Sequence, residues 1–148
     1  MFNLLSPVKE IMSKNLITLD KNATLEKVKE IFDNNKIHHI PVVEDEMLIG
    51  IISKSDFLFF QRGYSYGESM VEEVRLKTHH VHEVMTTGIA KLDINDKVNV
   101  ALEVFKENLF HAIPIESDGK LVGIVTTYDI INVLAKNNGA VAEYASVS

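Results

Sequence analysis

The chain has 148 residues, no cysteine and a formal net charge of −6 at neutral pH. Without cysteine there are no disulfides, thiol nucleophiles or cysteine-ligated zinc sites. The acidic balance argues against a general affinity for nucleic acid or an anionic membrane. Apolar runs such as Phe57–Phe60 are far too short to cross a bilayer, and the amino-terminal residues do not resemble a signal peptide. We therefore expect a cytoplasmic protein with neither a nucleic-acid nor a membrane partner.

The sequence contains two copies of one pattern. The first begins at Val8 and the second at Val81, and they superpose without a gap at an offset of 73 residues. Such self-similarity is typical of a repeat architecture. The positions kept in both copies include Met12 and Met85, Pro41 and Pro114, Gly50 and Gly123, and Asp56 and Asp129.

Each copy begins with a helical turn, an extended segment and a helix. In the first copy Ser6 is the expected cap of the turn and Pro7 its first residue. An extended segment over 16–19 follows, and Thr24 then caps the helix. Asparagines weaken the end of that helix, at 34 and 35 and again at 108. Apolar residues recur at helical spacing in both copies: Leu25, Val28, Ile31 and Phe32, then Val98, Ala101, Val104 and Phe105.

A hairpin and a second helix complete each copy. Two apolar β-branched runs over 40–43 and 48–53 predict the strands, with counterparts at 113–115 and 121–126. The last helix starts near Ser55-Asp56 or Tyr128-Asp129. A unit of this size buries too little apolar surface to be stable alone. We therefore expect an α/β (α+β) fold of two β-α-β-β-α repeats packed as one pseudo-two-fold pair.

The stretch between the copies is not duplicated. Gly63 and Gly67 interrupt it, and Ser69–Lys77 predicts a helix with apolar residues on one side. We expect the first repeat over 1–60, a linker with a short helix over 61–80, the second repeat over 81–136 and a loosely held tail over 137–148.

The most informative local pattern lies at the end of each predicted third strand. There the strand runs into a hydroxyl residue, Ser53 or Thr126, and an acid follows three positions later at a helix start. The hydroxyl and the helix N–H groups can hold a phosphate. The carboxylate of Asp56 or Asp129 can accept two hydrogen bonds from a ribose diol. A plain helix cap with a favourably placed acid explains the same residues equally well.

Two repeats with an apolar-Pro-apolar second strand, a Gly opening the third strand and a Ser/Thr-x-x-Asp ending resemble a pair of CBS domains, also called a Bateman module. The resemblance covers Val8 to about Phe57 and Val81 to about Ile130. It implies a stand-alone regulatory module that binds AMP, ADP, ATP or S-adenosylmethionine in clefts between repeats. By resemblance Asp56 and Asp129 hold ribose hydroxyls, and the neighbouring hydroxyl residues lie near phosphate.

The family often carries a His-Arg pair before the second-strand proline, directed at ligand phosphates. His38 and His111 match the histidine, whereas His39 and Ala112 stand in place of the arginine. Because a histidine is only partly charged near neutral pH, this departure weakens the case for a polyphosphate. Structural histidines beside a strand are the alternative interpretation.

The family also often has a threonine near the end of the first strand, beside the adenine. Thr18 fits this role, but Lys91 is its counterpart, so the two clefts should differ in ligand or affinity. The complete set of predicted ligand-binding residues is Ile17, Thr18, His38, His39, Ile40, Pro41, Ser53, Ser55, Asp56, Ala90, Lys91, His111, Ala112, Pro114, Thr126, Tyr128 and Asp129.

Other functions find less support. The run His79-His80-Val81-His82-Glu83 invites a metal site, but adjacent histidines on a linker do not naturally converge on one ion, so no metal or cofactor is expected. We expect no catalysis, because no nucleophile and base stand at a coherent spacing. The resemblance implies a homodimer that signals to a separate effector protein. The alternatives are a structural CBS dimer with empty clefts and, less favoured, a metal-assisted hydrolase.

Overall fold

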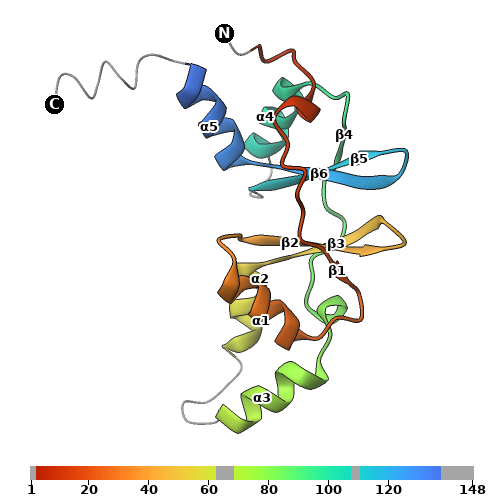
Figure 1. Cartoon of the computed structure of the whole chain (residues 1–148), viewed down its shortest axis with the longest axis vertical. Coiled ribbons are helices and arrows are strands. Elements are labelled where there is room, and N and C mark those ends of the chain that lie inside the picture. Colours follow the sequence, from red (N-terminus) through yellow and green to blue (C-terminus); the bar gives the residue numbers. More distant parts are fainter. Residues whose placement is uncertain (1–2, 63–68, 108–110, 138–148) are drawn as a thin grey trace, which may run out of the picture. The chain divides into compact units, whose positions relative to one another are not determined.

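The computed structural model describes residues 3–62, 69–107 and 111–137 and divides into two compact units (Figure 1). The first, here called the continuous unit, is Ile17–Ile89. The second, the composite unit, combines the described residues of Met1–Leu16 with those of Ala90–Ser148. Each unit contains helices and one three-stranded sheet, which confirms the predicted α+β class.

The continuous unit holds the sheet of the first repeat. Its strands lie in the order β1-β2-β3, with β1 parallel to β2 and β2 antiparallel to β3. A single-turn 3₁₀ helix, η2, follows the last α-helix of the unit. Its elements are β1 (Leu19–Asp20), α1 (Leu25–Asn34), β2 (His39–Glu44), β3 (Met47–Ser53), α2 (Lys54–Gln61), α3 (Ser69–Thr78) and η2 (Val81–Glu83).

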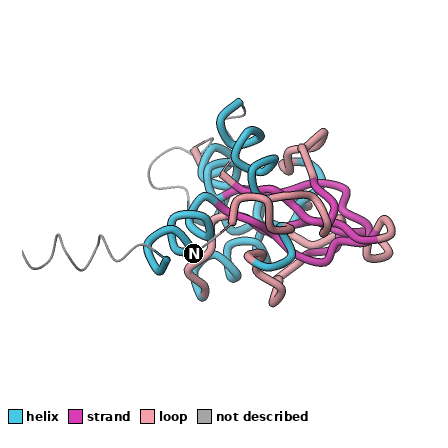
Figure 2. The backbone as a smooth tube through the Cα atoms, turned by 90° about the horizontal axis from the view of Figure 1, so that it is seen from above, coloured by secondary structure: helices cyan, strands magenta, loops and turns pink. Residues whose placement is uncertain are grey.

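The composite unit repeats this arrangement with the sheet of the second repeat. Its strands lie in the order β4-β5-β6, again with one parallel and one antiparallel pair. Figure 2 draws the strands in magenta and the helices in cyan. The 3₁₀ helix η1 belongs to this unit although it opens the first repeat. The elements are η1 (Val8–Glu10), β4 (Leu92–Asp93), α4 (Val98–Glu107), β5 (Ala112–Ser117), β6 (Lys120–Thr126) and α5 (Thr127–Asn137).

Helix α1 forms where the sequence predicts it. The Thr24 hydroxyl accepts a hydrogen bond from the Lys27 backbone N–H at 3.3 Å, which confirms the predicted cap. The helix ends at Asn34, where the asparagines stand. All four predicted apolar residues of α1 are buried, and they form one core with Ile40, Val42 and Ile52 of the sheet.

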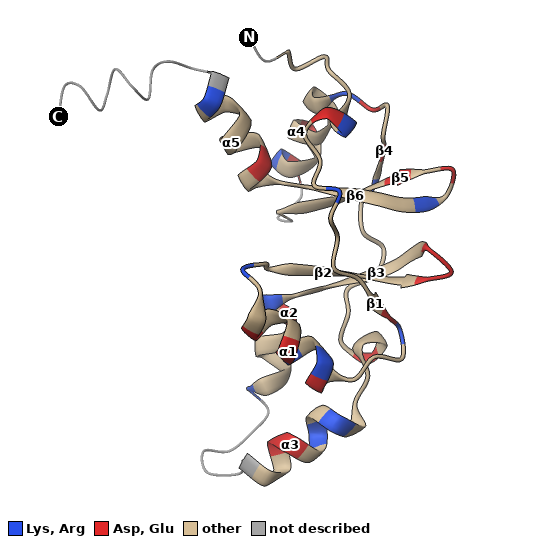
Figure 3. Ribbon diagram, viewed as in Figure 1, with Lys and Arg blue, Asp and Glu red and all other residues tan. Residues whose placement is uncertain are grey.

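The hairpins are longer than predicted because strand pairing continues up to a two-residue turn. Asp45 and Glu46 both have positive φ, at 50° and 67°, and Asp118 and Gly119 take the same path at 52° and 78°. Positive φ at both central residues is the type I′ geometry, which follows the natural twist of paired strands. Acidic residues lie at the tip of the β2–β3 hairpin, where Asp45 and Glu46 form the turn (Figure 3).

Two local predictions need correction. The first helical turn is a 3₁₀ helix in which Pro7, with extended ψ of 147°, is the cap, so the predicted Ser6 cap was wrong by one residue. The first strand pairs over two residues only, Leu19 and Asp20. The predicted helix α3 is present, and its apolar side does not enter the core: Met70 is 79 % exposed, and the buried residue of that helix is Leu76.

Other predictions cannot be placed on this structure. The glycines at 63 and 67, the asparagine at 108 and the tail from 138 onward lie outside the described residues. No helix of the described segments is both long and apolar enough to span a membrane.

The first residues of each repeat pair with the sheet of the other repeat. We call residues 6–13 and 79–86 the opening segments. Thr86 and Ile51 of β3 exchange both backbone hydrogen bonds, at 2.8 and 2.9 Å. Ser13 and Ile124 of β6 do the same at 2.9 and 3.1 Å. The compact units therefore differ from the sequence repeats, because each unit contains the sheet of one repeat and the opening segment of the other.

The glycine kept in each third strand makes this pairing possible. A Cβ atom at Gly50 would lie 2.5 Å from Met85 Sδ and 3.0 Å from the Thr86 carbonyl oxygen. At Gly123 it would lie 2.5 Å from Met12 Sδ. The pairing of methionine and glycine in both copies thus reflects a close approach of the methionine side chain, and of the backbone beside it, to the strand, which glycine accommodates.

We predict that Gly50→Ala lowers the free energy of unfolding by about 1–3 kcal/mol, because the added methyl group displaces the opening segment. Met85→Ala in the same chain removes the sulfur that the new methyl group meets. The double variant should therefore lose less than the sum of the two single losses. Urea unfolding of the four proteins measures this coupling, and additive losses would contradict the close contact.

Candidate functional site

The end of β3 and the start of α2 form a reciprocal capping box. The Ser53 hydroxyl accepts from the Asp56 backbone N–H at 3.0 Å, and Asp56 Oδ2 accepts from the Ser53 backbone N–H at 3.0 Å. The composite unit repeats it: Asp129 Oδ2 accepts from the Thr126 N–H at 2.8 Å, and Thr126 Oγ1 accepts from the Asp129 N–H at 3.2 Å. The structural role that the sequence left open is therefore present in both copies.

Each of these carboxylates also contacts a hydroxyl of an opening segment. Thr86 Oγ1 donates to Asp56 Oδ2 at 3.1 Å. Ser13 Oγ lies 3.5 Å from Asp129 Oδ1 and makes a longer, weaker contact. Sequence reasoning missed both hydroxyl residues. The signal was available, since Ser13 and Thr86 align at the repeat offset and both follow the paired methionine.

The capping box leaves part of each acid available. Among the described residues no hydrogen bond reaches Oδ1 of Asp56, and Oδ1 of Asp129 receives only the long contact from Ser13. Both acids are half-buried. An ionised carboxylate oxygen in this position can accept hydrogen bonds from a hydroxylated ligand. The predicted neighbours Ser55 and Tyr128 are exposed on the first turns of α2 and α5.

The predicted histidine pair lies against the same strand end. His39 of β2 is in register with Ser53, and the Lys54 N–H donates to the His38 carbonyl oxygen at 2.8 Å. In the composite unit Ala112 is in register with Thr126, and the Thr127 N–H donates to the His111 carbonyl oxygen at 3.1 Å. The side chains of His38 and His111 are exposed.

The residues beside the first strands differ between the units. Thr18 is exposed and stands one residue before the Leu19–Val42 pair, so it lies at the end of β1 nearest Pro41. Lys91 has the same place before β4, but its Nζ lies 2.9 Å from Glu116 of β5. The remaining predicted residues are strand or strand-entry positions: Ile40, Pro41 and Pro114 are buried, Ile17 is half-buried, and Ala90 is exposed.

The predicted residues thus sort into two sets, one in each unit. The set of the continuous unit surrounds Ser53 and Asp56, and that of the composite unit surrounds Thr126 and Asp129. Both sets combine strand ends, a helix start and a hydroxyl from an opening segment.

Asp56 also lines a pocket of about 490 Å³ in the continuous unit. Helices α2 and α3 and the end of η2 form its walls. The guanidinium of Arg75 lies 4.5 Å from the centre of the Phe60 ring, a distance that permits cation–π attraction. The sequence placed both arginines in the stretch between the repeats but assigned them no role. The lining residues are Asp56, Phe59, Phe60, Arg75, Glu83 and Val84.

A family model described as the CBS domain matches this chain twice, over residues 8–63 and 81–136. The chain belongs to the CBS domain family. Two such matches confirm the resemblance on which the sequence prediction rested. The matched part of the chain is a CBS pair, a regulatory module rather than a catalytic domain, as predicted.

Curated relatives include the protein MJ1225 of Methanocaldococcus jannaschii, 26 % identical over 132 residues, which are 88 % of this chain and 44 % of the relative. Inosine-5′-monophosphate dehydrogenase of Thermoplasma acidophilum is 29 % identical over 122 residues, 82 % of this chain and 22 % of the enzyme. The chain thus spans less than half the length of these relatives, and the enzyme's name describes a much longer protein.

Solved structures share the fold. CBSX2 in complex with AMP has a TM-score of 0.73 at 21 % identity, covering 88 % of this chain and 97 % of that one. The structure of MJ1225, described as a proposed archaeal homologue of γ-AMPK, has a TM-score of 0.76 at 20 % identity, covering 90 % of this chain and 49 % of that one. These likenesses support the CBS pair fold.

We predict that Thr86→Val lowers the free energy of unfolding by about 1–2 kcal/mol, because it removes a half-buried hydrogen bond to a carboxylate while keeping the side-chain shape. Ser13→Ala is the matched variant in the composite unit. Its longer, exposed contact should contribute less than about 0.5 kcal/mol. Urea unfolding measures both, and equal losses would mean that the two hydroxyl contacts are equivalent.

Proposed function

We propose that this chain is a sensor that binds an adenosine-containing ligand, such as AMP, ADP, ATP or S-adenosylmethionine, at the strand-end capping boxes. The observation that carries the proposal is the half-buried carboxylate of Asp56, held by Ser53 and Thr86 through one oxygen while the other remains open. A ribose diol offers two donors that suit such an acceptor. CBSX2, which shares the fold, was crystallised with AMP.

The carboxylate is pre-organised for this role. Because the capping box and the Thr86 hydroxyl fix its orientation before any ligand arrives, little side-chain entropy is lost on binding. The pocket beside Asp56 is within the size range of small-molecule sites and offers aromatic rings as well as polar groups.

The two units should not bind equally well. In the continuous unit Thr18 is exposed at the start of β1, and His39 stands in register with Ser53. In the composite unit Ala112 replaces His39, and the Lys91 ammonium is paired with Glu116. We therefore assign the tighter site to the continuous unit. The Lys91–Glu116 pair and the Ala112 position also favour a second candidate function for the composite unit, a structural role in which its site stays empty.

The test is a thermal-shift screen of the full chain with AMP, ADP, ATP, S-adenosylmethionine and adenosine. A ligand at 100 times its Kd should stabilise the protein by about 2.7 kcal/mol. Asp56→Asn keeps a side-chain oxygen for the cap but removes the charge, so it should weaken binding at least 10-fold, about 1.4 kcal/mol. Asp129→Asn should have the smaller effect if the continuous unit dominates.

Asp96→Asn is the matched control, because Asp96 Oδ2 also accepts from a backbone N–H, that of Asp93 at 2.8 Å, at an exposed turn away from the capping boxes. It should leave ligand binding unchanged. No shift with any nucleotide would reject the sensor and favour the structural module. Binding that survives both Asp56→Asn and Asp129→Asn would move the site elsewhere.

We further propose that the chain forms a homodimer through its helices and signals to a separate effector protein. Large apolar side chains are exposed on α2, α3 and α5, and exposed apolar patches mark interaction surfaces. Phe59 is 76 % and Ile131 62 % exposed. Phe59→Asp and Ile131→Asp should shift the chain toward monomer in sedimentation velocity. The matched exposed variant Met47→Asp, at the far end of a hairpin, should not, and a monomeric parent chain would overturn the proposal.

A further inference from the structure

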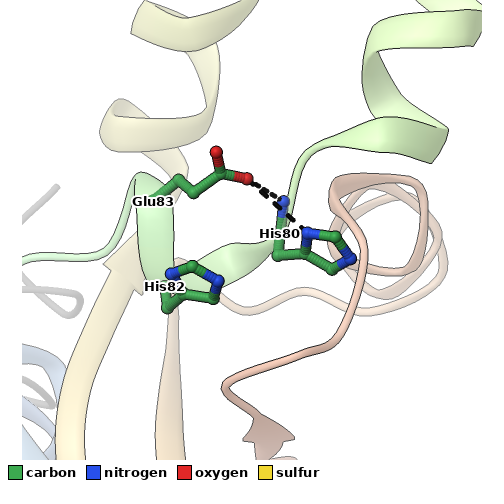
Figure 4. A group of neighbouring side chains, drawn as sticks. All are labelled: His80, His82 and Glu83. Atoms are coloured by element: carbon green, nitrogen blue, oxygen red, sulfur yellow. Dashed lines mark hydrogen bonds and ion pairs between the residues drawn. The ribbon is translucent and has the colours of Figure 1, made fainter.

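Three potential metal ligands lie together on η2 and its cap (Figure 4). The imidazole nitrogens of His80 and His82 and a carboxylate oxygen of Glu83 lie within 4.8 Å of one another. The two imidazole rings stack with centroids 5.8 Å apart and planes inclined by 7°. All three side chains reach solvent, since those of His80 and Glu83 are each 41 % exposed and His82 is exposed.

The distances between the three ligand atoms can be compared with those around a bound ion. Zinc held at about 2.0–2.1 Å in a tetrahedron needs ligand atoms roughly 3.3–3.4 Å apart. The side chains must therefore close by about 1.5 Å, which solvent-exposed rotamers permit. Glu83 Oε2 accepts from the His80 backbone N–H at 2.6 Å, and its other oxygen remains able to bind an ion.

The remaining histidine of this run lies outside the group. His79 takes no part, because its Nδ1 lies 3.0 Å from the Arg75 carbonyl oxygen and its ring packs against Phe60.

The fold itself does not require these histidines. In η1, the equivalent turn, Pro7 and Lys9 occupy the places of His80 and His82. The backbone bonds are nevertheless the same: Val84 and Met85 donate to the Val81 carbonyl oxygen at 3.1 and 2.9 Å. Their η1 counterparts, Ile11 and Met12, donate to that of Val8, both at 3.0 Å. Of the three ligand positions, only the acidic one has the same residue type in η1, where Glu10 stands in the place of Glu83. The backbone structure of this turn therefore does not explain the two histidines of η2.

We propose that His80, His82 and Glu83 bind one divalent transition-metal ion, with Zn²⁺ as the best match. Imidazole with one carboxylate suits zinc and similar ions rather than Mg²⁺ or Ca²⁺, which prefer oxygen ligands alone. Three protein ligands leave the fourth position to water. The site does not depend on the proposed nucleotide function, although Glu83 also lines the pocket beside Asp56.

The test is isothermal titration of the chelator-stripped full chain with Zn²⁺. The parent should bind one ion per chain at η2. His82→Lys, which copies Lys9 of the equivalent turn, and Glu83→Gln should each weaken binding at least about 10-fold. Glu10→Gln, the matched change in η1, should have no effect. Parent-like affinity in His82→Lys would overturn the site.

A second measurement separates a folded site from a histidine-rich segment that binds metal in any conformation. An ion that binds only the folded chain raises Tm, by about 5–10 °C at 100 times its Kd. Zn²⁺ should therefore raise the Tm of the parent and of Glu10→Gln but not that of His82→Lys. An unchanged Tm in the parent would overturn the proposal, because the unfolded segment would then bind equally well. Magnesium is the negative control in both measurements.

Discussion

Backbone pairing between each opening segment and a third strand holds this molecule's functional features in place. This pairing places Met85 against Gly50 and brings the Thr86 hydroxyl to Asp56. The turn that carries His80 and His82 lies a few residues earlier in the same opening segment. Because the two backbones approach so closely, the strand position facing the methionine must be glycine. The same constraint acts independently in the composite unit, between Met12 and Gly123.

The capping boxes combine a structural requirement with the binding role proposed for them. A helix start needs an acceptor for its first N–H groups, and an acid three residues after the cap satisfies the reciprocal bond. Only one carboxylate oxygen is required for this. The other is held in a fixed direction by bonds that the fold has already formed. Differences between the units accordingly occur at positions that the cap does not constrain, such as Thr18 against Lys91.

Comparing the two copies in sequence predicted most of the local structure. The Thr24 cap, the asparagines that end α1 and the hairpins follow from local chemistry, and the structure has them. The change of partner between opening segments could not be predicted, because the repeated sequence does not say which of the two sheets an opening segment joins. Ser13 and Thr86 are marked by their alignment at the repeat offset, but the carboxylate that each one contacts depends on this change of partner. The exposure of Met70 could not be predicted either, because periodicity identifies an apolar side but not what covers it.

The exchange of opening segments also bears on the order in which the units can form. The Thr86–Asp56 contact of the continuous unit spans 30 residues, whereas the Ser13–Asp129 contact of the composite unit spans 116. Closing the longer loop costs about 1 kcal/mol more in chain entropy. On the ribosome the continuous unit is complete once residue 89 has emerged. Ser13, whose backbone pairs with Ile124, must then wait for β6 to be synthesised, so the first opening segment completes its pairing only after the continuous unit can form.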